Sequence, residues 1–437
     1  MTQFTDFGLA EPILKALSAK GYATPTPIQA QAIPALLEGR DLCGIAQTGT
    51  GKTAAFALPS LDYFAEHPKP RPLRGCRMLV LSPTRELAAQ IADSFRDYGR
   101  FMRLEVQTVF GGVPVGKQVR ALEKGVDVLV ATPGRLLDLI EQRALTLKDV
   151  EIFVLDEADQ MMDLGFIQPL KRIHALLPKD RQSLFFSATM PTDIAKLAGG
   201  FLVDPVKVSV APQATTAERV RQYVSHVNVA EKAALLSMLL KSEPIDRALV
   251  FTRTKHGADK VVRQLAAVGV ESYAIHGNKS QAQRTTALQA FRDGRTKILI
   301  ATDIAARGID VQGVSHVFNY ELPNVAEQYV HRIGRTARAG RDGIAISLVS
   351  GDERDFLRGI EKLTRVRLDP MELPEGLAKA AASMPKPQRA PQAQSPRRDG
   401  GGRGAARPDA SGDGKRPFRH RRRPGVGTHK GAVVRAR

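Results

Sequence analysis

Short runs of hydrophobic residues alternate with longer amphipathic segments along most of the chain. Runs such as "MLVL" (78–81) and "ILIA" (298–301) are continuously hydrophobic, with no polar residue at alternate positions. Strands of this kind are typical of parallel sheets that helices cover on both faces. The pattern predicts strands over residues 77–83, 126–133, 151–159 and 183–189, and then over 247–254, 271–277, 297–303, 316–323 and 343–349.

The predicted strands form two groups, separated by a polar, Pro-interrupted segment over 203–220 that we expect to act as a hinge. We therefore predict an α/β protein with two tandem domains, each a mostly parallel sheet covered by helices. The expected boundaries are 1–210 for domain 1, 211–220 for a linker, 221–370 for domain 2 and 371–437 for a disordered basic tail.

Positive charge is concentrated near the C-terminus. The formal net charge is +19, and residues 376–437 hold 16 of the 64 Lys and Arg residues but only 3 of the 45 Asp and Glu residues. This segment is rich in Gly, Pro, Ala and Gln, and Phe418 is its only aromatic residue. Such a composition cannot bury enough apolar surface to offset the entropy of ordering the chain, and its natural partners are polyanions. A solubility tail and a protein-docking arm are the alternatives.

Cysteine content and hydropathy narrow the class of protein further. Cys43 and Cys76 are the only cysteines, which gives neither a disulfide framework nor a zinc site. No apolar run is long enough to span a membrane, and the N-terminus lacks a basic region followed by an apolar core. We expect a cytoplasmic protein.

The clearest chemical signal is "AQTGTGKT" (46–53), which follows a short apolar run and precedes a helical pattern. Glycines at such a loop let backbone N–H groups surround a phosphate, and the positive end of the helix dipole adds to the attraction. A lysine there reaches the outer phosphates, and a hydroxyl next to it can bind Mg²⁺. The generic pattern has Gly where this chain has Ala46, and a Gly-rich turn before a helix is the alternative. The predicted nucleotide-binding residues are Ala46, Gln47, Thr48, Gly49, Thr50, Gly51, Lys52 and Thr53.

A phosphate-binding loop needs an acid at the end of a second strand, and "VLDEADQ" (154–160) supplies one. We expect Asp156 to hold Mg²⁺ together with Thr53, and Glu157 to orient and deprotonate the attacking water. Alone, these acids could simply occupy the first turn of a helix, where the dipole stabilises them.

Together with "DEAD" at 156–159, these motifs make the chain resemble the DEAD-box RNA helicases, superfamily 2 ATPases built from two RecA-like domains, from about Phe4 to about residue 365. The near-minimal core and the basic tail look most like the bacterial RhlE type. The segment "GYATPTPIQ" (21–29) matches the family's Q motif, in which Gln29 reads the adenine edge while Phe4 and Tyr22 lie near the base. The resemblance implies ATP, with Mg²⁺, as the cofactor.

Further family motifs follow in the family's order. "PTRELA" (83–88), "GG" (111–112) and "TPGR" (132–135) resemble RNA contacts of the first domain, and "VFTRT" (250–254), "HGNKSQAQR" (276–284) and "ATDIAARGID" (301–310) resemble those of the second. The resemblance places Asp303 toward the ATP ribose. The implied RNA contacts are Arg85, Gly112, Thr132, Arg135, Arg253, Gln281, Arg284, Thr302 and Arg307.

The segment "HRIGRTARAG" (331–340) places arginines at a spacing of three with no acid among them. Like charges at this spacing repel on a helix, which suggests that the segment binds an anion. The resemblance implies that Arg335 and Arg338 contact the γ-phosphate of ATP as arginine fingers. A solvated basic face is the alternative.

Two further motifs of the family concern communication between the nucleotide and RNA. By resemblance, His331 couples the RNA side to the "DEAD" acids, and Ser187, Thr189 and Asp159 link hydrolysis to unwinding.

The implied activity is that of an RNA-dependent ATPase that locally opens RNA duplexes or remodels RNA–protein complexes. Single strands and short duplexes of little sequence preference are the expected partners, and the basic tail is expected to add nonspecific RNA affinity. A DNA-directed superfamily 2 translocase and a non-catalytic RNA-binding scaffold remain as alternatives.

Overall fold

The computed structural model describes residues 2–47, 49–210, 220–306, 309, 311, 313–337 and 342–384. Both predicted domains lie within one compact unit, Met1–Pro387. Thr48, Arg307, Arg338 and the basic tail from residue 385 lie outside the described residues, as do positions 211–219 of the expected linker.

Domain 1 contains a seven-stranded sheet in which every neighbouring pair of strands is parallel, as predicted. The strand order is β3-β4-β2-β5-β6-β1-β7. The strands are β1 (Leu42–Ile45), β2 (Cys76–Leu81), β3 (Val106–Val109), β4 (Val126–Ala131), β5 (Ile152–Leu155), β6 (Gln182–Ser187) and β7 (Val206–Ser209).

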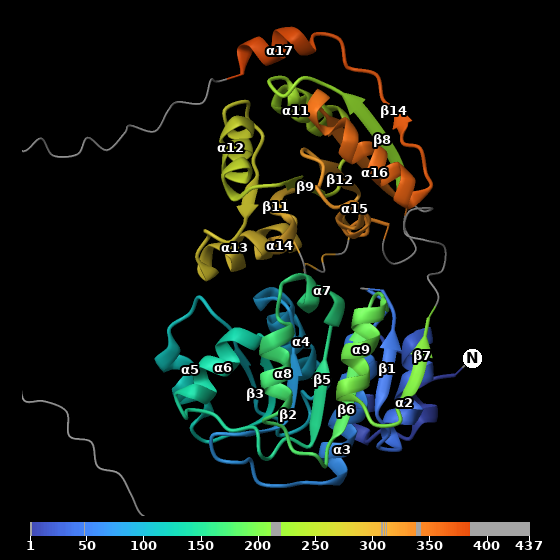
Figure 1. Ribbon diagram of the computed structural model, residues 1–437, viewed down its shortest axis with the longest axis vertical. Helices are drawn as coiled ribbons and strands as arrows, with labels where there is room; N and C mark the ends of the chain where they lie inside the picture. Colours follow the sequence, from blue (N-terminus) through green and yellow to red (C-terminus); the bar gives the residue numbers. More distant parts are fainter. Residues whose placement is uncertain are drawn as a thin grey trace, which may run out of the picture. The chain divides into compact units, whose positions relative to one another are not determined.

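Helices cover both faces of this sheet (Figure 1). The short helix η1 (Phe4–Phe7) precedes them along the chain. One face packs against α1 (Glu11–Ala19), α2 (Pro27–Leu37), α3 (Lys52–Glu66) and α4 (Arg85–Tyr98), and the other against α5 (Val115–Leu122), α6 (Pro133–Glu141), α7 (Ala158–Asp163), α8 (Ile167–His174) and α9 (Thr192–Phe201).

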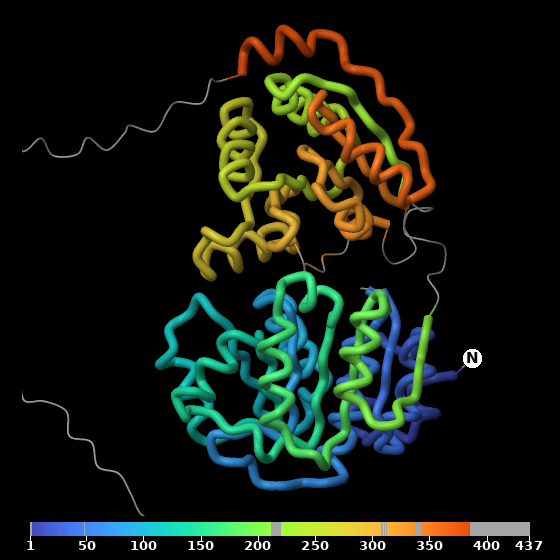
Figure 2. Tube along the Cα trace, in the orientation of Figure 1, coloured from blue at the N-terminus to red at the C-terminus, as the bar shows by residue number. Residues whose placement is uncertain are grey.

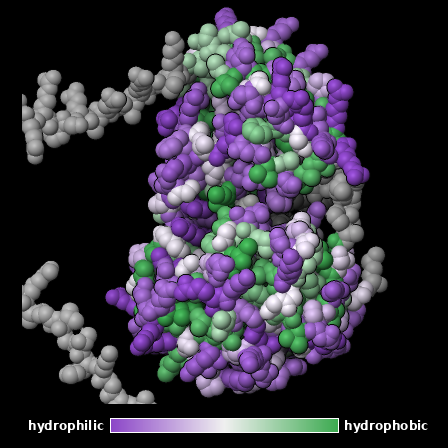
Figure 3. Space-filling view, in the orientation of Figure 1, coloured by the Kyte–Doolittle hydropathy of each residue, from purple (hydrophilic) through white to green (hydrophobic). Residues whose placement is uncertain are grey.

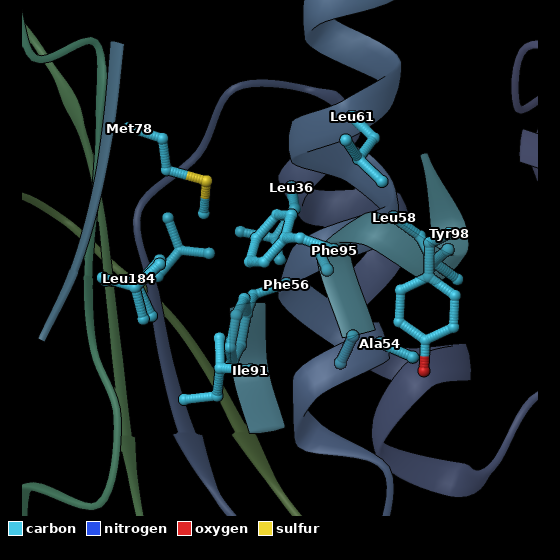
Figure 4. Close-up of a cluster of buried hydrophobic side chains, with 14 of the residues drawn as sticks. Leu36, Ala54, Phe56, Leu58, Leu61, Met78, Ile91, Phe95, Tyr98 and Leu184 are labelled. Carbon is cyan, nitrogen blue, oxygen red and sulfur yellow. The ribbon is translucent and has the colours of Figure 1, made fainter. Parts of the chain in front are cut away.

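Alternation along the strands divides the core into two layers. On β2, Met78 and Val80 join the cluster under α1–α4, while Leu79 and Leu81 join the cluster on the opposite face. Successive side chains of a strand point to opposite faces, so a strand that is covered twice must be hydrophobic at every position. Figure 4 shows part of the first cluster, where Phe56 packs against Phe95.

Domain 2 repeats the arrangement with a second parallel sheet of seven strands, in the order β10-β11-β9-β12-β13-β8-β14. The strands are β8 (Val220–His226), β9 (Ala248–Thr252), β10 (Tyr273–Ile275), β11 (Ile298–Thr302), β12 (His316–Asn319), β13 (Gly343–Val349) and β14 (Asp369–Pro370). One face packs against α11 (Lys232–Ser242), α12 (Lys255–Ala266) and α17 (Leu377–Ser383), and the other against α13 (Gln281–Arg292), α14 (Asp303–Ala306), α15 (Ala326–Ile333) and α16 (Arg354–Thr364), with η2 (Gly351–Glu353) before α16.

The predicted domain boundaries need correction. The last strand of domain 1, β7, lies within the predicted bounds of that domain but inside the segment expected to be a hinge, and Val220, expected in the linker, already belongs to β8. The chain also stays folded beyond residue 370, because Leu377 and Met384 are buried in the core of domain 2 and α17 packs beside α11 (Figure 2). The tail therefore begins later than the predicted residue 371. The sequence pattern did not reveal these elements, because β7 is a four-residue edge strand that is only partly buried and α17 is a short Ala-rich helix.

On the face shown in Figure 3, hydrophilic residues dominate and hydrophobic ones lie between them. Among the described residues, no helix is long and apolar enough to cross a membrane.

Candidate ATP and RNA sites

The predicted nucleotide-binding motifs meet at one edge of the first sheet. Strands β5, β6 and β1 are neighbours and parallel, so their carboxyl ends lie side by side. The phosphate-binding loop follows β1, Asp156 follows β5, and Ser187 ends β6. Ligands of open α/β sheets bind at this edge.

The loop before α3 has the backbone that its glycines predict. Gly49 and Gly51 have φ of +86° and +95°, in the left-handed region that favours glycine. The buried Lys52 ammonium donates to the Ala46 carbonyl at 3.0 Å, so the lysine lies across its own loop. Thr53 is half-buried in the first turn of α3. The loop geometry is that of a phosphate cradle.

Gln29 connects the Q motif to this loop. Its Nε2 donates to the Gly51 carbonyl at 3.1 Å, and its Oε1 accepts from the Thr26 backbone N–H at 2.9 Å. A Cβ at Gly51 would lie 2.4 Å from that Nε2, so only glycine fits there. One N–H and one lone pair of the amide remain for a ligand, and they are the pair of groups that an adenine edge requires.

The two aromatic residues of the predicted adenine site differ in exposure. Tyr22 is 43% exposed, 6.5 Å from the ring of Tyr98. Phe4 is buried in the core of domain 1 and packs edge-on against Phe7. The sequence did not predict this core position.

Asp156 and Glu157 form a buried acidic pair, and each is only 2% exposed. Burial raises the pKa of Asp156 to about 7; Lys52 opposes this shift and Glu157 adds to it. Glu157 also has a left-handed backbone, with φ of 54°, a conformation that costs free energy in a residue other than glycine. Strain and desolvation of this kind gather at functional sites.

The same residues fit Mg²⁺. The raised pKa of Asp156 means that Lys52 does not fully offset the cost of burying its charge, and Mg²⁺ is usually held by one or two carboxylates together with substrate phosphates and water. In the described part of the chain, no cluster of three or more His, Cys, Asp or Glu side chains could hold a metal ion. Asp156 and the Thr53 hydroxyl would supply the protein's ligands.

Asp159 connects the end of β5 to the end of β6. Its Oδ2 accepts from the backbone N–H groups of Ala188 and Thr189 at 3.1 and 3.0 Å, and from Thr189 Oγ1 at 3.1 Å. Ser187 is fully buried. The structure thus brings Asp159 and Thr189, two of the predicted coupling residues, into direct contact.

Three predicted RNA contacts of domain 1 lie close together. Arg85 packs over Gly112, where an added Cβ would lie 2.0 Å from Nη1. Burial lowers the pKa of the Arg85 guanidinium, and the charges of Arg284 and Arg135 lower it further. Such a concentration of positive charge favours an anion, and arginines of this kind bind nucleic-acid phosphates. Thr132 follows β4 directly and is the N-cap residue of α6.

Residues of α13 join this cluster. Arg284 Nη2 lies 2.7 Å from the Glu86 carboxylate, and Arg85 Nη1 donates to Gln281 Oε1 at 3.5 Å. Glu86 stands inside the quoted "PTRELA" motif, but sequence reasoning assigned it no role. Its position next to an arginine in the motif was the available signal.

In domain 2, acidic residues hold Arg253. Its backbone N–H donates to Glu321 Oε2 at 2.7 Å, and its Nη2 lies 3.5 Å from the fully buried Glu353. Thr302 is the last residue of β11, at the carboxyl edge of the second sheet.

The arginines of "HRIGRTARAG" have different environments. Arg332 is 1% exposed, and its Nε and Nη2 donate to the two carboxylate oxygens of Asp303 at 2.5 and 2.7 Å. It also donates to Asn319 and lies 5.0 Å from the centre of the Phe251 ring. Arg332 is therefore part of the core of domain 2, and its anion is Asp303. The predicted ribose contact of Asp303 would have to use the lone pairs that this ion pair leaves.

Arg335 is also buried, at 7% exposed. Its Nη1 donates to the Ile309 carbonyl at 3.1 Å and its Nε to the His331 carbonyl at 3.3 Å. His331, Arg335 and Asp303 line the same pocket.

Arg332→Met should lower the free energy of unfolding by about 3–5 kcal/mol, because it leaves the Asp303 carboxylate without its partner. Urea unfolding followed by circular dichroism measures the loss. Arg358→Met, which breaks an exposed pair with Asp355, is the matched control and should cost less than about 1 kcal/mol. Equal losses in the two variants would contradict the structural role of Arg332.

Comparisons with known proteins agree with this arrangement. The family model described as DEAD/DEAH box helicase matches residues 26–197, and the helicase conserved C-terminal domain matches residues 231–340. The ATP-dependent RNA helicase CshA of Listeria monocytogenes is 42% identical over 374 residues, which are 86% of this chain and 71% of that protein. CshA of Bacillus subtilis is 41% identical over 85% of this chain and 74% of its own.

A solved structure shows the same fold with both ligand classes present. The structure of S. cerevisiae Dbp5 bound to RNA and ADP BeF3 is 31% identical to this chain, with a TM-score of 0.74, and covers 87% of this chain and 98% of that chain. The fold, the site and the sequence comparisons lead to one conclusion. The chain has two parallel-sheet domains, a phosphate-binding loop beside a buried "DEAD" acid pair, and RNA helicases as relatives at 41–42% identity. The chain belongs to the DEAD-box family of ATP-dependent RNA helicases.

Proposed function

We propose that this protein hydrolyses ATP in response to RNA and uses the cycle to open short RNA duplexes or to remodel RNA–protein complexes. The observation that supports this most is the buried Asp156–Glu157 pair beside the Lys52 loop. A scaffold without catalysis has no use for a strained, desolvated acid pair at this position.

The proposed chemistry assigns each residue a task. The loop backbone and Lys52 hold the phosphates, and Gln29 selects adenine. Glu157 orients the attacking water and takes its proton, while Arg335 and Arg338 offset charge that develops on the transferred phosphoryl group. Bound Mg²⁺ would neutralise phosphate charge, with Asp156 and Thr53 holding it.

We propose that RNA binds through its sugar–phosphate backbone. The predicted contact residues of both domains would bind the same RNA strand. Backbone contacts carry little sequence information, so we expect little sequence preference. If ATP and RNA each contact both domains, each raises the affinity for the other by the same factor. Asp159 and Thr189 would transmit the state of the nucleotide to the RNA side.

The test compares ATP hydrolysis without nucleic acid, with single-stranded RNA and with DNA of the same sequence. We expect strong stimulation by RNA only, together with ATP-dependent separation of a short RNA duplex. Equal stimulation by DNA would favour the DNA translocase, and absence of turnover would favour the scaffold.

Removal of the tail is a separate prediction. A chain ending at Met384 keeps α17 and the core of domain 2 but loses the basic tail. It should bind RNA more weakly at low salt, with a shallower dependence of log affinity on log salt, because each neutralised phosphate releases counterions. Turnover at saturating RNA should stay near that of the full chain. An unchanged salt slope would favour a solubility or protein-docking tail.

Two finer assignments remain predictions. The RhlE type rests on the short core and the basic tail, whereas the relatives described above are named CshA. The cytoplasmic location rests on the cysteine content and the hydropathy of the sequence.

A further inference from the structure

Helix α5 has cations on its exposed side. Lys117, Arg120 and Lys124 stand at positions i, i+3 and i+7, all exposed, and the helical backbone continues through the C-cap Glu123 (φ −54°, ψ −42°). Residues at this spacing share one face of a helix. We call these three residues the basic stripe.

Contacts on the inner side of α5 fix the orientation of the helix, so that the side chains of the basic stripe face away from the core. Gln118 and Leu122 are buried, and Gln118 Nε2 donates to the Phe110 carbonyl at 2.9 Å. Arg135 Nη1 donates to Gln118 Oε1 at 3.2 Å, so α5 packs directly beside the predicted RNA contact at the start of α6. Rotation of α5 would break these bonds, and the stripe therefore keeps its orientation.

Among the described residues, the stripe has no carboxylate as counter-ion. No carboxylate of the described residues lies within ion-pair distance of Lys117, Arg120 or Lys124, whereas many other cations of domain 1, such as Arg77 and Arg172, are paired. General basicity does not account for this, because residues 1–210 contain 24 Lys and Arg against 23 Asp and Glu. Three like charges on one helix face repel one another, and an external anion would relieve the repulsion.

The position of the stripe indicates which anion. Helix α5 begins three residues after Gly112, where Arg85 packs, and its inner side supports Arg135. An RNA strand whose phosphate backbone contacts Arg85, Gly112 and Arg135 would next reach the N-terminal end of α5. Successive cations along the helix lie roughly 4.5 and 6 Å apart along the axis, which suits the phosphates of one strand.

We propose that the basic stripe binds RNA that continues beyond the segment held by the helicase core. This inference rests on the proposed function, since it extends the same RNA path. RNA long enough to reach α5 would gain phosphate contacts that a short RNA lacks, and so the stripe would favour long substrates without base recognition.

The experiment uses the full chain with Lys117, Arg120 and Lys124 all changed to Gln. The matched control changes Lys15, Arg100 and Arg103 to Gln, three exposed cations of domain 1 with no ion pair among the described residues. Two oligouridine RNAs serve as probes: the shortest that fully stimulates hydrolysis by the unmodified protein, and one twice as long. Affinity is measured by fluorescence anisotropy over a salt series.

We expect the stripe variant to bind the long RNA roughly 10-fold more weakly at low salt, with a salt slope shallower by about 2. Its hydrolysis with the short RNA should match that of the unmodified protein, which also shows that the variant is folded. The control should lose much less affinity for the long RNA. Equal losses of affinity for the long RNA in both variants, or an unchanged salt slope in the stripe variant, would overturn the proposal. The stripe would then be a solvated helix face or a site for an acidic protein partner. Failure of the proposed function would look different, because the unmodified protein would then show no RNA stimulation with either probe.

Discussion

Replacing Arg335 with alanine should lower RNA-stimulated ATP hydrolysis by about 10³-fold, the low end of what arginine fingers supply in related NTPases. Arg335 is buried beside His331, and carbonyl oxygens hold two of its N–H groups in place. A guanidinium held in this way loses little freedom when it meets a phosphate, so its effect falls on the chemical step. Single-turnover hydrolysis at saturating RNA and ATP measures the loss.

Nucleotide affinity provides the internal check on Arg335→Ala. ATP binding to the Arg335→Ala variant without RNA should stay near that of the unmodified protein, because Lys52 and Gln29 belong to domain 1. Lys362→Ala, which removes an exposed cation on α16, is the matched control and should leave hydrolysis unchanged. Normal hydrolysis by Arg335→Ala would exclude it as a finger and leave that task to Arg338.

Glu157→Gln should slow hydrolysis by roughly 10²-fold or more while ATP and RNA still bind. Glutamine keeps the shape of the side chain and its hydrogen-bonding capacity, but it cannot accept the proton of the attacking water. The left-handed backbone at this position costs glutamine about as much as glutamate, so stability should change little. Rapid-quench hydrolysis and equilibrium binding of a fluorescent ATP analogue separate the two effects.

Glu123→Gln is a suitable control for this variant, because Glu123 is an exposed acid distant in sequence from the "DEAD" motif. It should hydrolyse ATP normally. Near-normal turnover by Glu157→Gln would remove Glu157 from the role of base, and loss of ATP binding would assign it to the binding of nucleotide instead.

Local sequence was enough to predict the elements that carry the chemistry. Gly49 and Gly51 were expected to let backbone N–H groups surround a phosphate, and both have a left-handed backbone, which glycine adopts readily. The continuous hydrophobic runs predicted parallel strands, because only a strand covered on both faces needs apolar side chains at every position. The ends of those strands were predicted less well: the run 151–159 was expected as one strand, but β5 ends at Leu155 and α7 begins at Ala158.

Elements with weak local signals escaped prediction. The edge strand β7 has only four residues, and the final helix α17 has only seven and follows a Pro-containing segment, so neither pattern is long enough to identify an element from the sequence. Both exist because tertiary packing supplies what propensity does not, through pairing with β1 in one case and burial of Leu377 in the other.

By itself, the sequence determined the two-domain parallel architecture, the phosphate-binding loop and the acid pair, because each depends on residues that are close along the chain. Tertiary structure alone decided which charges are partners. Arg332 and Asp303 are 29 residues apart, and Glu86 and Arg284 are 198 apart. Arg284 was expected to contact RNA and Arg332 had no assigned role. Only the folded chain shows that each of these arginines has a carboxylate beside it. The spacing of the arginines in "HRIGRTARAG" predicted an anion, but only the burial of Arg332 showed that one of these arginines belongs to the core. Electrostatic partners depend on distance in space and on desolvation, and neither can be read from position in the sequence.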